Sequence, residues 1–339
     1  MGLSAYQATT MNWREQLRRN ERKTKIVIAL FIALYGIVGL LIDILLVQSQ
    51  YPQATITQAL YALGTGRIVP YATIILGLVA LLSLWVTYML HDKLMLLGTN
   101  AREITAQTAR SLQEKQLVHV VEEMKVAAGL QYMPKVYLIE ADYMNAFASG
   151  YSERSAMVAI TRGLMEKLDR AELQAVMAHE LSHIRHHDIK LTLMVAILSN
   201  LMLIVIDSLF YSLLFKRDRR DDNRLVALIM VLRYLLPIIT VMLALFLSRT
   251  REYMADAGAV ELMRDNEPMA RALLKIHEDH QVHAEQYARA YADTPHEQVR
   301  QTSYLFDPAQ LLSVKSLSNL FSTHPDLASR LKSIGFHKQ

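Results

Sequence analysis

The chain has 339 residues, of which 52% are hydrophobic and 20% are charged, and its mean hydropathy of +0.17 is high for a soluble protein. It contains no cysteine, so disulfides and thiolate metal ligands are excluded. The formal net charge is +4. The basic residues gather beside apolar blocks, which reports membrane orientation rather than nucleic-acid binding, and we expect no nucleic-acid partner.

Four apolar blocks are each long enough to cross the roughly 30 Å hydrocarbon layer as a helix. The first is too long for a signal-peptide core, and no A-x-A-like site follows it, so we expect it to be retained. Four such lengths favour membrane spans over the buried helices of a large soluble core. The blocks are Ile26 to Val47, Val69 to Leu90, Ile189 to Phe215 and Leu225 to Leu247.

Basic residues before the first block place the N-terminus in the cytoplasm by the positive-inside rule. Arg67 is the only basic residue in the sequence 48–68, as expected of an exported loop. Residues 91–188 are then expected to lie on the cytoplasmic side. The loop 216–224 conflicts with this scheme, because its basic residues favour the inside although two crossings put it outside. Either the last two blocks both cross and break the rule, or they form a hairpin that does not cross fully. Their lengths favour full crossing.

A charged residue within an apolar block needs a partner, because an unpaired charge there is costly. In an antiparallel hairpin centred on Arg220, Asp207 and Arg233 lie at matching depth. We therefore predict an Asp207–Arg233 pair. An ion pathway would need more intramembrane carboxylates than the blocks contain.

Between the second and third blocks the pattern changes to that of an α+β domain. Residues 98–129 are typical of a polar amphipathic helix. Short β-like runs follow at 136–139, 146–149 and 157–160, which predicts a small sheet in front of the next helix. Near the other end of the chain, residues 281–303 are the expected mobile insertion.

The helix after the sheet carries His179-Glu180-Leu181-Ser182-His183, an H-E-x-x-H pattern. Asp169 and Glu172 form a capping-box pattern at its start, and no Pro or Gly interrupts it through Asp188. Two imidazoles four residues apart share a helix face and can bind one ion, while Glu180 can accept a proton from an activated water. Because His and Glu are common on helix surfaces, the pattern needs further ligands in support.

A third ligand is predicted just after the fourth block. A catalytic zinc usually takes three protein ligands and keeps one position for water. Glu252 and Asp256 share a helix face, so we expect Glu252 to complete the site and Asp256 to accept a ring N–H. Alone, this stretch is equally typical of a solvated helix end. On the same membrane face as H-E-x-x-H, it favours a metal site.

The remaining histidines favour plainer interpretations. His186 and His187 follow the pattern closely, and we expect polar groups at the helix-to-lipid boundary rather than ligands. His277, His280 and His283 lie beside acidic residues, where a solvated helix is favoured over a second metal site.

These motifs resemble the HtpX-type integral-membrane zinc metalloproteases, a family shared with the CAAX prenyl proteases. H-E-L-S-H is followed, after two apolar blocks, by E-x-x-x-D, as in that family. Asn145-Ala146-Phe147-Ala148 resembles its substrate-binding edge strand, and His324-Pro325 with Arg330 resembles its C-terminal H-P-x-x-x-x-R element. Asp326 replaces a usual second Pro. The resemblance covers essentially the whole chain, and the four blocks match HtpX rather than the seven-span prenyl protease.

The resemblance implies four transmembrane helices and a cytoplasmic, gluzincin-like α+β protease domain in the bacterial inner membrane. One Zn²⁺ per chain would be held by His179, His183 and Glu252. Glu180 would be the general base, with His324 and Arg330 facing the oxyanion. Residues 145–148 would hold the substrate as an added β-strand. The parts expected along the chain are a cytoplasmic segment (1–25), a first transmembrane pair (26–91), the front of the catalytic domain (92–188), a second transmembrane hairpin (189–248) and the rear of the catalytic domain (249–339).

As a function, the resemblance implies an endopeptidase that degrades misfolded or damaged membrane proteins under heat or envelope stress, and it allows self-cleavage. Two alternatives stay open: a narrow-specificity processing peptidase of the prenyl-protease type, and a non-catalytic metal-binding membrane protein. The sequence leaves the natural substrates and the oligomeric state open.

Overall fold

The structure, a computed structural model, describes residues 6–8, 13–96, 99–150, 152–215, 223–294, 304–306 and 324–338. The chain forms two compact units. The site unit comprises Met1–Lys23, Tyr88–Thr192 and Leu245–Gln339, and the helical unit comprises Thr24–Thr87 and Leu193–Ala244. All the residues predicted for the metal and peptide sites belong to the site unit.

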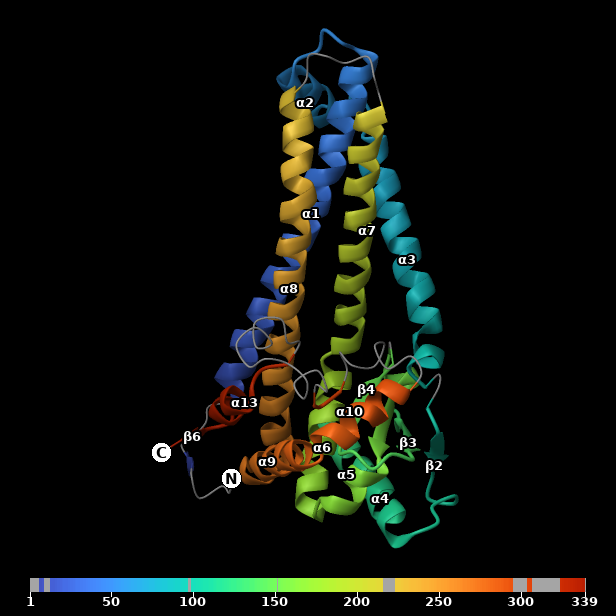
Figure 1. Cartoon of the computed structure of the whole chain (residues 1–339), viewed down its shortest axis with the longest axis vertical. Helices are drawn as coiled ribbons and strands as arrows, with labels where there is room; N and C mark the ends of the chain where they lie inside the picture. Colours follow the sequence, from blue (N-terminus) through green and yellow to red (C-terminus); the bar gives the residue numbers. More distant parts are fainter. Residues whose placement is uncertain are drawn as a thin grey trace. The chain divides into compact units, whose positions relative to one another are not determined.

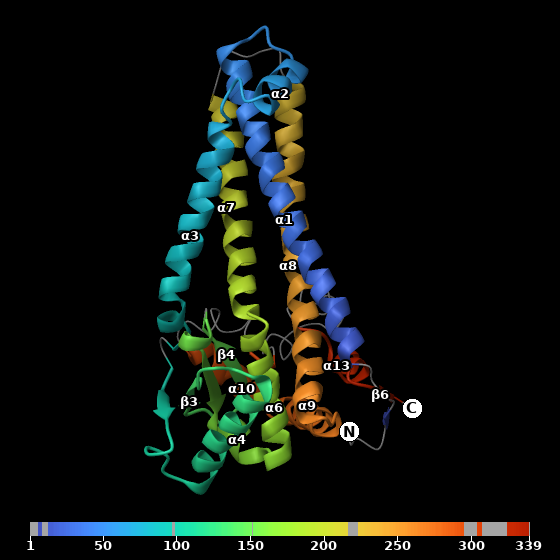
Figure 2. The same ribbon diagram turned by 180° about the vertical axis from the view of Figure 1, so that it is seen from behind.

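The helical unit is built from parts of long helices that run alongside one another in both ribbon views (Figures 1 and 2). These helices are α1 (Trp13–Gln50), α3 (Tyr71–Leu96), α7 (Asp188–Phe215) and α8 (Asn223–Met263). A buried apolar cluster of Val38, Met202, Ile206 and Leu236 joins α1, α7 and α8. The short helix α2 (Ile56–Gly64) begins at a Thr55 capping box and packs on α1.

Two of these helices have the length and apolarity of membrane spans among the described residues, at Arg18–Gln50 in α1 and Ile229–Met263 in α8. The apolar stretches Tyr71–Ser83 in α3 and Ser199–Tyr211 in α7 are shorter. Large apolar side chains cover the outside of the unit, as lipid contact requires. That all four blocks cross the membrane stays a prediction.

Two acidic side chains of the helical unit, Asp43 and Asp207, have polar partners. Arg233 Nε lies 2.7 Å from Asp207 Oδ1, which confirms the predicted pair. Asp43 accepts hydrogen bonds from the backbone N–H groups of Ala72 and Thr73, at 2.8 and 3.0 Å. These N–H groups belong to the first turn of α3 and have no partner within the helix, so the carboxylate of Asp43 is satisfied without a cation.

The site unit contains a mixed sheet of order β2-β3-β5-β4. Its strands are β2 (Ala101–Ile104), β3 (Lys135–Ile139), β4 (Ala146–Ser149) and β5 (Met157–Thr161). β3 and β5 are parallel, and the two outer pairs are antiparallel. The three predicted strands are confirmed, and β4 lies at an edge of the sheet.

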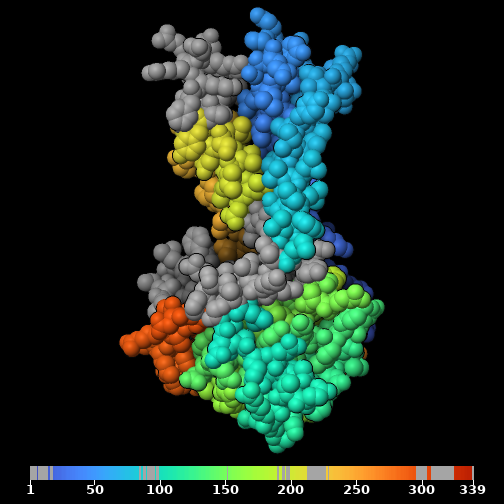
Figure 3. All heavy atoms as spheres, turned by 90° about the vertical axis from the view of Figure 1, so that its right-hand side faces the viewer, coloured from blue at the N-terminus to red at the C-terminus, as the bar shows by residue number. Residues whose placement is uncertain are grey.

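The prediction of one helix over residues 98–129 is wrong at its start. β2 occupies the first part, and α4 (Leu112–Ala128) begins only after Ser111, whose side chain accepts a hydrogen bond from the Glu114 N–H. Arg102 on β2 donates to Glu114 at 2.6 Å, so a charged contact holds the strand beside the buried side chain of Ile104. Figure 3 shows β2 and α4 on one outer face of the unit.

The H-E-x-x-H helix, α6 (Arg170–Arg185), packs against α4 and β4. Its predicted capping box is present: Glu172 N–H donates to Asp169 at 2.8 Å, and Asp169 N–H donates to Glu172 at 2.9 Å. The helix ends earlier than predicted. His187 has a φ of +53°, so the chain turns there, and α7 starts at Asp188.

The opposite face of the sheet carries an aromatic cluster that joins β4 to α10 (Ala284–Asp293) through Phe147, Tyr287 and Tyr291. Successive side chains alternate across a strand, so Ala146 and Ala148 face the other way, towards α6. The expected insertion at 281–303 is helical up to Asp293, and residues 295–303 lie outside the described part. The other elements are α5 (Arg162–Lys167), α9 (Glu267–Val282), α13 (Leu327–Ser333), a 3-10 turn (Glu153–Ser155) and the pair β1 (Tyr6–Ala8) with β6 (Phe336–Lys338).

Candidate metal centre

Three side chains, His179 and His183 of α6 and Glu252 of α8, offer ligand atoms to one point. The Nε2 atoms of the two rings lie 3.2 Å apart. Each Glu252 oxygen lies 3.6 Å from one of them, Oε2 from His179 and Oε1 from His183. Ligands about 2.1 Å from a tetrahedral ion are separated from one another by about 3.4 Å. The triangle therefore has the size that a single metal ion requires.

The charges around the triangle also fit a divalent cation. With both rings neutral and every carboxylate ionised, four buried carboxylates facing two buried guanidiniums would leave an excess of two negative charges. Buried charge without a counter-charge is costly. The carboxylates are those of Glu180, Asp188, Glu252 and Asp256, and the guanidiniums are those of Arg251 and Arg330.

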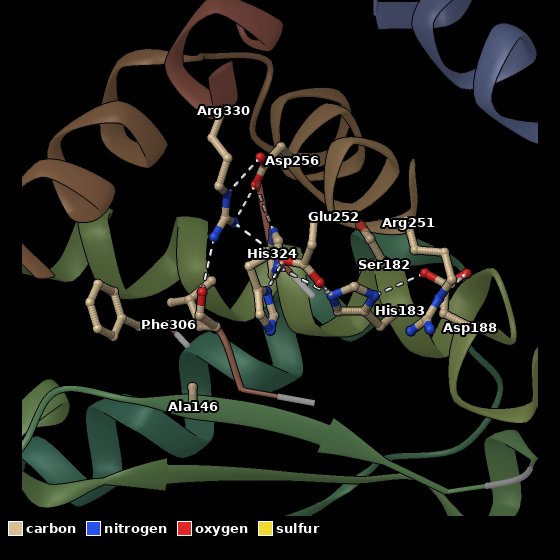
Figure 4. A network of polar contacts seen from close by, with 12 residues as sticks. Ala146, Ser182, His183, Asp188, Arg251, Glu252, Asp256, Phe306, His324 and Arg330 are labelled. Carbon is tan, nitrogen blue, oxygen red and sulfur yellow. Dashed lines mark hydrogen bonds and ion pairs between the residues drawn. The ribbon is translucent and has the colours of Figure 1, made fainter. Parts of the chain in front are cut away.

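Asp256 stands behind the His179 ring. Its Oδ1 lies 3.0 Å from His179 Nδ1, so Nε2 is left to face the triangle. Arg330 donates to both oxygens of Asp256, at 2.7 and 3.0 Å (Figure 4). Burial disfavours charge on the ring, but Asp256 and Glu252 outweigh it and raise the pKa of His179 to about 9. A metal ion bound through this ring would therefore have to displace a proton from it.

Asp188 plays the same part for His183, and the sequence analysis missed it. Its Oδ2 lies 2.9 Å from His183 Nδ1, and its Oδ1 lies 3.4 Å from Arg251 Nε (Figure 4). The expected helix ran through Asp188, which would have carried this side chain away from the ring. The turn at His187 brings it back. The sequence did contain a signal for this role, because Asp188 is an acidic residue that follows H-E-x-x-H at a point where the helix can end.

Glu180 is buried beside the two rings, and its carboxylate oxygens have no hydrogen-bond partner in the described part of the chain. Burial raises the pKa of this carboxyl group. A buried carboxylate left without a partner is costly to folding and suited to exchanging a proton with a bound reactant.

Gly258 allows α8 to approach α6. A Cβ at this position would lie 2.4 Å from Ser182 Oγ and 2.8 Å from Ser182 Cβ. Ser182 is itself fixed, because its hydroxyl donates to Ala178 O at 2.8 Å. The absent side chain therefore sets the helix separation at which Glu252 meets the two rings.

His324 and Arg330, predicted to face the oxyanion, both lie beside Glu252. His324 Nδ1 is 3.3 Å and Arg330 Nη2 is 3.7 Å from Glu252 Oε2. The other Arg330 donors are directed to Asp256 and, at 2.9 Å, to Leu305 O. Asp326, which departs from the family pattern, caps α13 by accepting from the Ser329 N–H at 2.8 Å.

The predicted peptide-binding strand is β4, and Asn145 precedes it. The Asn145 amide nitrogen donates to Tyr291 Oη at 2.9 Å and to Phe306 O at 3.0 Å. Figure 4 shows Ala146 below Phe306, on the side of the centre that faces the sheet. The structure thus brings the strand and the centre to one region of the site unit.

The prediction of a solvated helix around His277, His280 and His283 is wrong for His280, which is fully buried. This side of α9 faces the aromatic cluster instead of solvent. Burial lowers the pKa of His280 to about 4, so the ring is neutral. Within the described residues, only His179, His183 and Glu252 form a group that could hold a metal ion.

Comparison with known proteins places the chain in a family. The profile of Peptidase family M48 matches residues 111–335. A Protease HtpX homolog of Helicobacter pylori is 39% identical, covering 95% of this chain and 98% of that protein. The HtpX homolog of Streptococcus uberis is 34% identical over 94% of this chain and 97% of its own. The crystal structure of S. mikatae Ste24p matches with a TM-score of 0.47 and 18% identity, covering 97% of this chain and 68% of that one. The chain therefore belongs to peptidase family M48, among the HtpX-type membrane metalloproteases.

Proposed function

We propose that this protein is a zinc-dependent endopeptidase that holds one zinc ion per chain through His179, His183 and Glu252. The observation that carries the proposal is the spacing of these three side chains: the two Nε2 atoms lie 3.2 Å apart, and each lies 3.6 Å from a different oxygen of Glu252. Two imidazoles and a carboxylate are a donor set that zinc prefers at catalytic sites. When bound, the ion supplies Lewis-acid polarisation of a peptide carbonyl and of a water molecule.

The residues of the chain supply the remaining chemistry. Glu180 accepts the proton of the attacking water and passes it to the leaving amine, a task for which its carboxylate has no competing hydrogen bond among the described residues. Asp256 and Asp188 keep the two rings in the tautomer whose Nε2 is unprotonated. His324, beside Glu252, would face the oxyanion that develops on the substrate.

We further propose that the substrates are unfolded or damaged membrane proteins, as quality control requires. Main-chain hydrogen bonds to the edge strand β4 would tolerate many sequences, provided that the segment bound is extended. The same tolerance would permit self-cleavage. The positive-inside rule supports a catalytic unit on the cytoplasmic side of a bacterial inner membrane, next to such substrates.

The test compares the full-length chain in detergent with its Glu180→Gln variant, using an unfolded casein-type protein as substrate. We expect cleavage that a chelator abolishes, and a variant that keeps one zinc per chain but loses about 10²- to 10⁴-fold in rate. Glu122→Gln is the matched control, because Glu122 is largely exposed and lies outside the centre. Full activity of Glu180→Gln would contradict the proposal, and cleavage confined to a prenylated C-terminal motif would favour the processing alternative.

A further inference from the structure

Part of the chain lies on the free edge of β4. The segment Tyr304–Phe306 approaches this edge so that Leu305 N–H donates to Ala146 O at 2.9 Å. The Asn145 amide bonds both backbone groups of Phe306: its Oδ1 accepts from the N–H at 3.1 Å, and its Nδ2 donates to the carbonyl at 3.0 Å. An extended segment bonded to an edge strand in this way has the form of a peptide added to the sheet.

The groups that bind this segment are those that the proposed function gives to a substrate. Asn145 and the Ala146 carbonyl belong to the predicted peptide-binding strand. Arg330, predicted to face the reacting carbonyl, donates to the Leu305 carbonyl at 2.9 Å. The chain itself thus occupies the peptide side of the centre, while the Glu180 carboxylate stays without a hydrogen-bond partner in the described residues.

A chain of hydrogen bonds from His280 through Tyr291 to Asn145 orients the Asn145 amide so that it can bind the backbone of a peptide. Neutral His280 directs Nδ1 to the Ile276 carbonyl at 2.9 Å, so this nitrogen carries the proton and Nε2 accepts from the Tyr291 hydroxyl at 3.4 Å. The Tyr291 oxygen in turn accepts from Asn145 Nδ2. The amide oxygen of Asn145 is therefore left for N–H donors, and the side chain offers one donor and one acceptor, as a peptide backbone does.

The side chains of the segment show what the site accepts. The Phe306 ring stacks on His280, with centroids 3.9 Å apart and planes 26° apart. A small recess of about 30 Å³ adjoins the segment and reaches His324 and Arg330 of the centre. Its apolar wall consists of Leu273, Ile276, Leu305, Phe306, Pro325 and Leu327. The bulky apolar side chains of Leu305 and Phe306 thus lie beside His324 and Arg330, and their displacement would free room for those of another peptide.

We propose that the β4 edge and this recess bind extended peptides that carry adjacent bulky apolar residues, and that Leu305–Phe306 is the chain's own occupant, which a substrate displaces. The inference rests on the proposed function, because the site is the one where cleavage would occur. A peptide running the length of β4 also gains the backbone groups of Ala148, which point to the same edge as those of Ala146. Adjacent bulky apolar residues are buried in folded proteins and become accessible on unfolding, so the site selects damaged substrates.

The test measures peptide binding without turnover, in full-length zinc-loaded Glu180→Gln in detergent. The probes are fluorescent extended peptides of about ten residues, with a central Leu-Phe pair or a Ser-Ser pair. Adding Phe306→Ala removes the ring that stacks on His280, and a site freed of its occupant should bind the Leu-Phe peptide about tenfold more tightly. Val282→Ala, at an exposed apolar position of α9, should leave affinity unchanged. Equal or weaker binding by the Phe306→Ala variant, or no preference for Leu-Phe, would overturn the proposal.

A second measurement needs no change in the segment. Saturating Leu-Phe peptide should speed hydrogen exchange of the Leu305 and Phe306 amides, because it takes their partners. If the peptide fails to bind, or binds while these amides keep their protection, the segment is a permanent strand and the proposal is wrong. Neither readout involves catalysis, so a wild-type chain that binds the peptide but does not cleave it would contradict the proposed function alone.

Discussion

The two histidines of the centre are held by the same chemistry but by different parts of the fold. Behind His179 stand Asp256 and Arg330, which come from α8 and α13, more than seventy positions along the chain. Behind His183 stand Asp188, five positions later, and Arg251. We call His179 with Asp256 and Arg330 the first arm of the centre, and His183 with Asp188 and Arg251 the second arm. The first arm is therefore a product of tertiary packing, and the second begins as a local turn.

The arms also differ in how firmly their aspartates are held. Arg330 makes two hydrogen bonds to Asp256, at 2.7 and 3.0 Å, whereas Arg251 Nε lies 3.4 Å from Asp188. Asp256 is fully buried. Metal affinity should therefore depend on the packing of α8 against α6 more than on the local turn.

Among the changes that test this comparison, Asp256→Asn should have the largest effect, which is on zinc affinity. The amide cannot balance the buried Arg330 guanidinium or hold the His179 tautomer, so we expect zinc affinity to fall about 100-fold. Competition with a chromophoric chelator measures it. Asp293→Asn, on the exposed end of α10, is the matched control. A loss no greater than that of Asp188→Asn would refute the ranking of the two arms.

Gly258→Ala tests whether the close approach of α8 to α6 positions the residues of the first arm. The added Cβ would meet Ser182 Oγ at 2.4 Å, so we expect about 2 kcal/mol less stability and weaker zinc binding. Gly36→Ala, where a Cβ meets nothing within 4 Å, should cost nothing. Ser182→Gly should restore much of the loss in the double variant, as chemical denaturation in detergent would show. Additive losses would mean that this contact does not set the spacing.

His280 provides a contrast to His179 and His183: carboxylates face those two rings, whereas neutral groups surround the ring of His280. Its closest partners are the Ile276 carbonyl and the Tyr291 hydroxyl, with Asp279 and Lys167 further away. Because burial lowers its folded-state pKa from 6.5 to about 4, the unfolded chain binds the extra proton first as the pH falls. Stability should drop by about 2 kcal/mol between pH 7 and pH 5 from this group. In His280→Gln, the free energy of unfolding should fall less between pH 7 and pH 5, as chemical denaturation at several pH values would show. An unchanged dependence on pH would contradict a neutral buried ring.

Asp188→Asn should have the smallest effect, a loss of about tenfold in zinc affinity. The asparagine keeps an oxygen that can accept from His183 Nδ1–H, and Arg251 is less tightly engaged than Arg330. The same chelator competition applies. No change at all would indicate that the second arm does not orient its ring.

Local signals were enough for several parts of this site. The capping box of Asp169 and Glu172 fixed the start of α6, because both its bonds lie within four residues. Glu252 and Asp256 are one helical turn apart, so a helix brings them to one face whatever surrounds it. Strands β3, β4 and β5 have apolar runs that only a buried sheet accommodates.

Other parts depend on contacts that no local pattern contains. β2 has only four residues, two of them charged, and it is held by its pairing with β3 and by the contact of Arg102 with Glu114, so its sequence shows no strand periodicity. Asp188 faces His183 only because His187 adopts a left-handed conformation, which is uncommon for a residue other than glycine. Leu305 meets Ala146 across more than 150 positions, a contact that only the folded chain defines.

The most direct test of the central claim is the zinc content of the purified chain, measured by elemental analysis before and after dialysis against a moderate chelator. We expect one zinc per wild-type chain to survive dialysis, and none in Glu252→Gln, whose amide replaces one vertex of the triangle while the two imidazoles stay. A Glu252→Gln chain that retains one zinc as firmly as the wild type would show that this carboxylate is not a ligand.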